Sequence, residues 1–130
     1  MVQRRELKRF EKSISLNMRL LGVFIRPLTV NVRTRNVSLE GLSIELSKQQ
    51  GSLNLIPYLI LDGNDVALHM KLPPKDELIR AIGRIIWSQS GSRKDRYSFK
   101  AGIFLEEIED RIKWIDFLRN IAEVKERSES

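Results

Sequence analysis

Residues 28–46 read LTVNVRTRNVSLEGLSIEL, and this stretch decides the class of fold. Leu28, Val30 and Val32 alternate with polar residues, and the same alternation returns over residues 42–46. A period of two puts the apolar side chains on one face of a β-strand. The polar stretch between the two runs contains turn-forming residues. The sequence therefore predicts two neighbouring strands, each with one buried face.

Further segments along the chain have strand character, with Gly83 predicting a bulge or a close backbone approach in one of them. Short turns separate them and no helical pattern intervenes, so we expect antiparallel pairing. Six short strands leave exposed edges unless the sheet closes, which favours a six-stranded antiparallel β-barrel. The apolar run 53–61, interrupted by Pro57, stays open between a buried strand, a short helix and a flap. The additional strand segments are residues 14–20, 66–72, 78–87 and 97–105.

After Leu105 the apolar period changes from two to that of a helix. We expect an amphipathic C-terminal α-helix over residues 107–126, docked on the barrel or forming a homodimer contact through its wide apolar face. Four carboxylates between residues 106 and 110 would then occupy its first turn, where they favour the positive end of the helix dipole.

The composition points to one small domain without catalytic chemistry. Its 130 residues are 42% apolar, include no cysteine and contain one histidine, which removes thiol catalysis and most metal sites. We expect a single domain over 1–130, with a basic arm at 1–10, the barrel at 11–105 and the helix beyond. With no membrane span and no secretory leader in the sequence, we expect a cytoplasmic protein.

The charge of the chain is concentrated at its beginning. Lysine and arginine number 23 and the acidic residues 17, a formal charge of +6. Residues 1–36 hold nine of these cations and two carboxylates, a local charge of +7, whereas the residues from 106 onward sum to −3. Such a gradient favours an anionic partner near the N-terminal arm: nucleic acid, a membrane surface or a small phosphorylated ligand.

Two polar clusters stand out within this region: RRELKR at residues 4–9 and RNVSLEG at 35–41. A basic arm is often solvated charge, and the second cluster is explained as a turn in which Gly41 adopts a positive φ. The same turn also presents the Asn36 amide, the Ser38 hydroxyl and backbone N–H groups, which are the donors that an anionic nucleotide needs.

Together the two clusters resemble the motifs of the PilZ domain, the bacterial receptor module for cyclic di-GMP. Arg5 and Arg9 fit its RxxxR motif, and Asn36, Ser38 and Gly41 fit its (D/N)xSxxG motif. Two later stretches resemble the fifth and sixth strands of the family, and the longer connection between the third and fourth strands departs from its pattern. These three stretches are GRIIW at 83–87, AGIFL at 101–105 and residues 48–64.

The resemblance implies a PilZ-type split barrel and a set of contacts to cyclic di-GMP. Arg5 and Arg9 would bind guanine edges and phosphates, as the guanidinium fork matches the O6 and N7 acceptors of guanine. Asn36 would bond a guanine edge or a ribose, Ser38 would touch a phosphate, and Gly41 would allow close approach. Further candidates beside these positions are Lys8, Arg35 and Gly102.

Arg4 precedes the RxxxR motif, a position associated in PilZ domains with ligand stoichiometry, and an arginine there suggests an intercalated nucleotide dimer. We expect Arg4 to Leu7 to order on binding and to create a surface for an unidentified effector protein. Two alternatives stay open: a PilZ-fold adaptor without nucleotide, and a nucleic-acid-binding barrel. Nucleic acid is disfavoured because the polar faces carry almost no aromatic residues. Trp87 and Trp114 are interpreted as core or interface residues.

Overall fold

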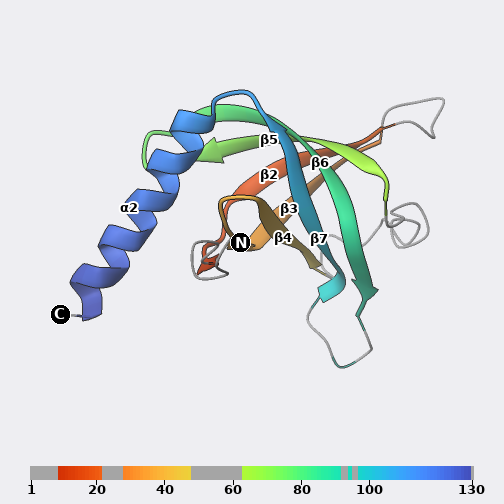
Figure 1. The fold of residues 1–130 in the computed structure, drawn as a ribbon. Helices are drawn as coiled ribbons and strands as arrows, with labels where there is room; N and C mark the ends of the chain where they lie inside the picture. Colours follow the sequence, from red (N-terminus) through yellow and green to blue (C-terminus); the bar gives the residue numbers. More distant parts are fainter. Residues whose placement is uncertain (1–8, 22–27, 48–62, 92–93, 95–96, 130) are drawn as a thin grey trace, which may run out of the picture.

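Alternation of buried and exposed side chains defines the strands of this protein. The computed structural model describes residues 9–21, 28–47, 63–91, 94 and 97–129, and its strands wrap around one core (Figure 1). In this part of the chain the elements are β1 (Phe10–Glu11), β2 (Ser15–Leu20), β3 (Leu28–Val37), β4 (Gly41–Ser47), β5 (Asp65–Leu72), β6 (Glu77–Ser90), β7 (Tyr97–Ile108) and α2 (Arg111–Glu129).

Six of these strands close into an antiparallel barrel. They run in the order β3, β2, β5, β6, β7, β4, and β4 pairs back with β3. The remaining strand, β1, pairs with the end of β3 that β2 leaves free, with Phe10 opposite Val37 and Glu11 opposite Asn36. The predicted six-stranded barrel with a C-terminal helix is confirmed, and β1 is an addition to it. Closure removes the sheet edges that six open strands would expose.

The core takes the apolar residues of each alternating run. On β2, for example, Leu16, Met18 and Leu20 are buried and the residues between them are exposed. The predicted bulge at Gly83 is present as a register shift between Ile82 and Gly83 in the pairing of β6 with β7. A side chain at Gly83 would overlap that of Ile103, so glycine lets the two strands approach. The apolar run 53–61 lies outside the described residues.

The C-terminal helix begins later than the sequence predicted. The alternating strand β7 continues through Glu106 and Glu107 to Ile108, and α2 starts only at Arg111. The expectation that four carboxylates occupy the first turn of the helix is therefore wrong. Asp110 precedes the helix and accepts a hydrogen bond from the Lys113 backbone N–H at 3.1 Å, which is the geometry of an N-cap.

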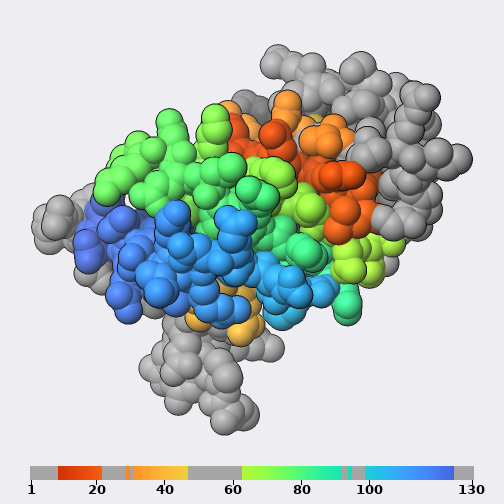
Figure 2. All heavy atoms as spheres, turned by 90° about the horizontal axis from the view of Figure 1, so that it is seen from above, coloured from red at the N-terminus to blue at the C-terminus, as the bar shows by residue number. Residues whose placement is uncertain are grey.

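The helix packs against one end of the barrel (Figures 1 and 2). Its buried stripe consists of Trp114, Phe117 and Leu118, with Ile121 partly buried beside them. Ile112 remains largely exposed, so the apolar face of the helix is only partly covered by the described part of the barrel.

Candidate functional site

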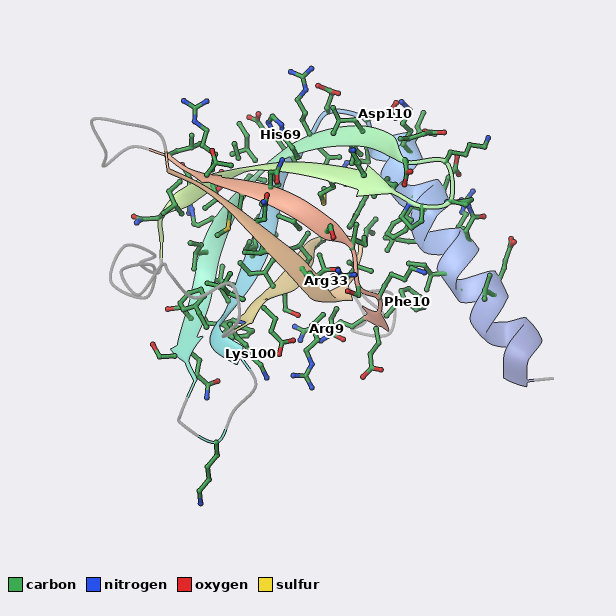
Figure 3. The ribbon with its side chains drawn as sticks, turned by 180° about the vertical axis from the view of Figure 1, so that it is seen from behind. Arg9, Phe10, Arg33, His69, Lys100 and Asp110 are labelled. Atoms are coloured by element: carbon green, nitrogen blue, oxygen red, sulfur yellow. The ribbon has the colours of Figure 1, made fainter. Side chains whose placement is uncertain are left out.

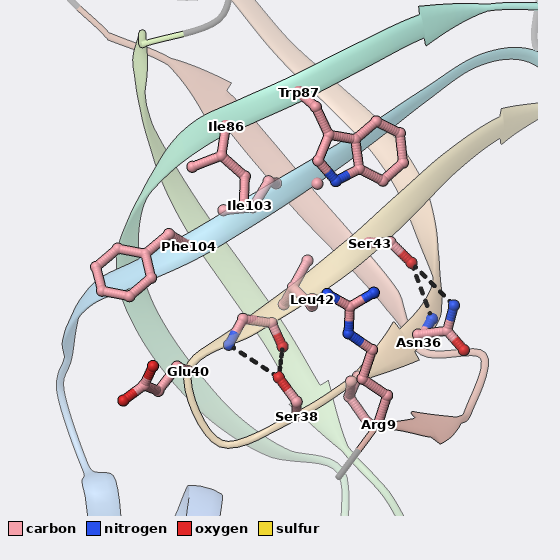
Figure 4. Close-up of a pocket in the computed structure, with 13 residues that line it drawn as sticks. Arg9, Asn36, Ser38, Glu40, Leu42, Ser43, Ile86, Trp87, Ile103 and Phe104 are labelled. Carbon is pink, nitrogen blue, oxygen red and sulfur yellow. Dashed lines mark hydrogen bonds between the residues drawn. The ribbon is translucent and has the colours of Figure 1, made fainter. Parts of the chain in front are cut away.

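A pocket of about 190 Å³ opens on the outer face of the barrel where β4, β7 and β6 lie side by side (Figure 4). Arg9, which immediately precedes β1, the end of β3 and the turn into β4 complete its lining. The residues that line it are Arg9, Asn36, Val37, Ser38, Glu40, Gly41, Leu42, Ser43, Ile86, Trp87, Gly102, Ile103 and Phe104.

The strand register explains why the surface is hollow at this point. Asn36 on β3 lies opposite Ser43 on β4, Ser43 lies opposite Gly102 on β7, and Gly102 lies opposite Trp87 on β6. Adjacent strands are about 4.8 Å apart, so this row crosses roughly 14 Å of sheet. The two middle positions carry a serine and a glycine. Small side chains in the middle and large ones at the ends of the row produce a depression with two walls.

The apolar wall of the pocket rests on Gly102. A Cβ atom at this position would overlap the Trp87 indole, so the ring lies across the glycine and is held close to the sheet. Trp87 is nevertheless 38% exposed, and its neighbours Ile86 and Phe104 are also exposed. In Figure 4 these three side chains stand on the side of the pocket away from Asn36. They offer an accessible apolar surface at the mouth of a polar pocket.

Arg9 forms part of the opposite wall, and the segment that follows Arg9 is held to β3 by Thr34. The buried Thr34 hydroxyl donates to the Lys12 carbonyl at 2.6 Å and accepts from the Ile14 backbone N–H at 2.8 Å. The pairing of Phe10 with Val37 adds a second attachment. Arg9 is exposed and directed toward the pocket (Figures 3 and 4).

The turn from Ser38 to Gly41 is closed by its own hydrogen bonds. The Ser38 hydroxyl donates to the Gly41 carbonyl at 3.0 Å and accepts from the Gly41 N–H at 3.2 Å, and the Ser38 N–H donates to the same carbonyl at 2.8 Å. A hydroxyl has one hydrogen to donate. Since that hydrogen is used within the turn, Ser38 shapes this side of the pocket while keeping an oxygen lone pair.

Gly41 is required for a different reason from the one the sequence suggested. Among the described residues the only glycine with positive φ is Gly63, at 90°, so the predicted positive φ at Gly41 is wrong. A Cβ at Gly41 would instead lie 2.7 Å from the Ile103 carbonyl oxygen on β7. Glycine is needed there because β4 begins in close contact with its neighbour.

Asn36 is oriented by Ser43 and keeps unused hydrogen-bonding capacity. Its backbone N–H and its side-chain Nδ2 both donate to the Ser43 hydroxyl oxygen, at 3.2 Å and 3.4 Å. An asparagine amide has a second N–H and an acceptor oxygen. Among the described residues these have no partner, so they are available at the pocket surface.

The lining carries one cation, Arg9, and one carboxylate, Glu40. The described part of the pocket is therefore close to neutral. Any strongly anionic ligand needs further positive charge, and the chain that precedes Arg9 holds Arg4, Arg5 and Lys8, which lie outside the described residues.

Of the residues that the sequence singled out, Arg9, Asn36, Ser38, Gly41 and Gly102 all line this pocket. Arg35 is exposed on β3 and is not among the lining residues.

The sequence analysis missed Trp87 and Ser43. Trp87 was interpreted as a core or interface residue, but it forms a pocket wall, whereas Trp114 is fully buried. The signal for Ser43 was present, because the residue lies on the polar register of its strand, two positions after the second motif.

A second, larger groove of about 850 Å³ lies between β1, the Pro73–Pro74 turn and α2. Arg9 lines both this groove and the pocket. The apolar residues of the groove are Phe10, Pro73, Pro74, Phe117, Ile121 and Val124.

Other candidate chemistry is not supported in the described part of the chain. His69 is exposed on the outer surface of β5 (Figure 3), and no group of three or more metal-ligating side chains occurs among the described residues. The same residues include no helix with the length and hydropathy needed to cross a bilayer.

Comparison with known proteins bears on this arrangement. The family model of the PilZ domain matches residues 3–117. The structure of the Bacillus subtilis inhibitor of motility (MotI/DgrA) superposes with a TM-score of 0.64 at 16% identity, over 98% of this chain and 52% of that one. This chain thus spans about half the length of that protein, and the likeness shows a common fold. No curated protein sequence matches the chain. Because the family model covers most of its length, the chain belongs to the PilZ domain family.

Proposed function

We propose that this protein is a receptor for cyclic di-GMP, which binds in the pocket between the N-terminal arm and the row of residues from Asn36 to Trp87. PilZ domains are receptor and adaptor modules associated with this nucleotide. The observation that carries the proposal is that Arg9, Ser38 and Gly102, which are far apart in the sequence, line one pocket.

The chemistry of the lining suits a guanine nucleotide. Arg9 offers a guanidinium fork that matches the O6 and N7 acceptors of guanine or the oxygens of a phosphate. The amide atoms of Asn36 that have no partner in the described part of the chain complement the donors and acceptors on a guanine edge. The exposed indole of Trp87 offers a stacking surface, a contact that contributes about 1–3 kcal/mol per base in other proteins.

The arm supplies the charge that the described pocket lacks. Arg4, Arg5 and Lys8 would close over the bound nucleotide and neutralise its phosphates. Fixing the backbone of a residue costs about 1–2 kcal/mol, so ordering the short segment 4–7 is compatible with micromolar binding. The arginine at position 4 favours two nucleotides per chain, bound as an intercalated dimer.

The role proposed here is signalling without catalysis. The ordered arm and nucleotide would form a new surface for an effector protein in the cytoplasm, and the exposed part of α2 offers a contact for a second copy. Arg35 lies on β3 beside Asn36 and would contribute positive charge near the pocket without lining it.

Calorimetric titration with cyclic di-GMP tests the proposal, and cyclic di-AMP is the matched control. Adenine has an amino group where guanine has the O6 acceptor, so binding through guanine edges predicts saturable binding of the first nucleotide and at least tenfold weaker binding of the second. Equal affinities would contradict guanine recognition. Affinity for an oligonucleotide that rises with its length and falls steeply with salt would instead identify a nucleic-acid-binding barrel.

A further inference from the structure

Trp114 is the most deeply buried aromatic residue of α2, and its indole carries a polar N–H group. The side chain is 0% exposed. A buried N–H group needs an acceptor. Nε1 donates to two backbone carbonyls at once, that of Ser38 at 3.2 Å and that of Leu39 at 3.3 Å. The helix therefore finds the partner for its buried donor in the turn that forms one side of the pocket.

This contact joins the turn directly to the helix. The turn is also held by its internal bonds through Ser38 and by the Glu40 carbonyl, which accepts from the Leu105 N–H of β7 at 2.8 Å. Among the described residues, the Trp114 indole N–H is the only group of α2 that donates a hydrogen bond to this turn, and it is shared between two carbonyls. Any displacement of the turn changes the geometry of that bond directly.

Trp114 also contacts Phe117, a residue that lines the groove. The rings of Trp114 and Phe117 are 5.5 Å apart between centroids and inclined by 34°. Phe117 in turn lines the groove between α2 and β1. The opposite wall includes Arg9, which the groove shares with the pocket. One wall of the groove thus shares Arg9 with the pocket, and the other contains Phe117, whose ring packs on Trp114.

We propose that Trp114 is a positioning residue for the pocket: its indole N–H holds the turn 38–41 in place and transmits displacement of this turn to α2. The part of this proposal that concerns ligand rests on the proposed function. The positioning role itself is a property of the free protein and can be measured without ligand.

Two replacements remove the N–H and keep an aromatic ring. Trp114→Phe is the simple variant, and replacement of the indole by the isosteric benzothiophene ring preserves the volume in case the smaller ring impairs folding. Phe117→Leu is the matched control, because it removes the ring contact in the same stripe of α2 and leaves the N–H bond to the turn intact.

Amide hydrogen exchange in the free protein gives the first readout. We expect both N–H-deficient variants to exchange about tenfold faster at residues 38–41, corresponding to the loss of one buried hydrogen bond, and Phe117→Leu to leave these amides unchanged. Unchanged exchange in the isosteric variant would overturn the positioning role, whatever the protein binds.

Cyclic di-GMP gives the second readout. If Trp114 transmits displacement of the turn, the ligand should slow exchange at residues 112–118 of the native protein. The N–H-deficient variants should bind it roughly tenfold more weakly and lack this protection, whereas Phe117→Leu should lower the melting temperature with its dissociation constant unchanged. If every variant, Phe117→Leu included, loses affinity in proportion to its loss of melting temperature, Trp114 acts only through packing. Absence of binding by the native protein would refute the proposed function and leave the exchange result standing.

Discussion

The Trp87 indole occupies the space that a side chain at Gly102 would need. These two residues face each other across β6 and β7, and together they set the depth of the pocket. Position 102 must be glycine for the Trp87 ring to lie this close to the sheet.

Gly102→Ala should displace the Trp87 ring and alter the pocket. Since the ring is partly exposed, it can swing outward, and we expect a loss of unfolding free energy of about 1–3 kcal/mol together with weaker binding of cyclic di-GMP. Urea unfolding and calorimetry measure the two effects. In a Trp87→Ala background, Gly102→Ala should cost much less, and equal costs in both backgrounds would show that the two positions are independent.

Trp87 should report ligand binding by its fluorescence. The protein contains two tryptophans, of which Trp114 is fully buried and Trp87 lies at the mouth of the pocket. A guanine base stacked on the exposed ring should quench its emission, so titration with cyclic di-GMP should lower the fluorescence of the native protein. Trp87→Phe should abolish this change and leave the emission of Trp114. A full signal in that variant would place the ligand elsewhere.

Arg9→Ala should weaken cyclic di-GMP binding by about 1.5–3 kcal/mol, which is roughly tenfold or more, because it removes a charged hydrogen-bond donor from the pocket wall. Arg80→Ala is the matched control. Arg80 lies on β6 outside the pocket and forms an exposed ion pair with Glu109 at 3.5 Å. Its replacement by alanine lowers the net charge by the same amount as Arg9→Ala. Equal losses in calorimetry would show that only total charge is recognised.

Ser38→Ala should destabilise the protein before any ligand is present. The alanine removes both hydroxyl hydrogen bonds that close the turn to Gly41, at an expected cost of about 0.5–2 kcal/mol in unfolding free energy. Ser38→Thr keeps the hydroxyl and should recover most of that loss in urea unfolding. Unchanged stability in Ser38→Ala combined with weaker nucleotide binding would instead mean that the hydroxyl acts on the ligand.

Arg4→Leu should change how many nucleotides bind. We expect two cyclic di-GMP molecules per native chain and one per variant chain, since the third arginine of the arm offsets the phosphates of the second nucleotide. Sedimentation velocity and calorimetry both count bound nucleotide. A native ratio of one would exclude this role for Arg4, and the pocket proposal would remain.

The barrel could be predicted because its strands follow a strict period of two. On β5, for example, Val66, Leu68 and Met70 are buried, as their spacing indicates. The start of α2 was misplaced because carboxylates at residues 106–110 suit a helix N-terminus as well as the end of an exposed strand. These residues extend the strand because β7 pairs with β6 as far as Ile108. Such pairing is a long-range contact that local sequence does not encode.

The polar side of the pocket could likewise be found from the sequence, since Asn36, Ser38 and Gly41 belong to one motif. The apolar side could not. Trp87 is in the pocket because register sets it opposite Gly102 and because glycine leaves it room, and both facts depend on how distant strands pair. The role of Trp114 was hidden for the same reason, as its hydrogen-bond partners are 75 and 76 residues away.

The close approach of β4 to β7 at Gly41 has a consequence for how this site can change. At Gly41 and Gly102 the available volume is already taken, by a backbone carbonyl in one case and by an indole in the other. Neither position can gain a side chain without moving its neighbours. Ile86 and Phe104 project from the wall into solvent and are free of that constraint. Substitutions at Ile86 and Phe104 can therefore change which ligand or partner the pocket accepts during evolution. Gly41 and Gly102 stay fixed by the geometry of the barrel.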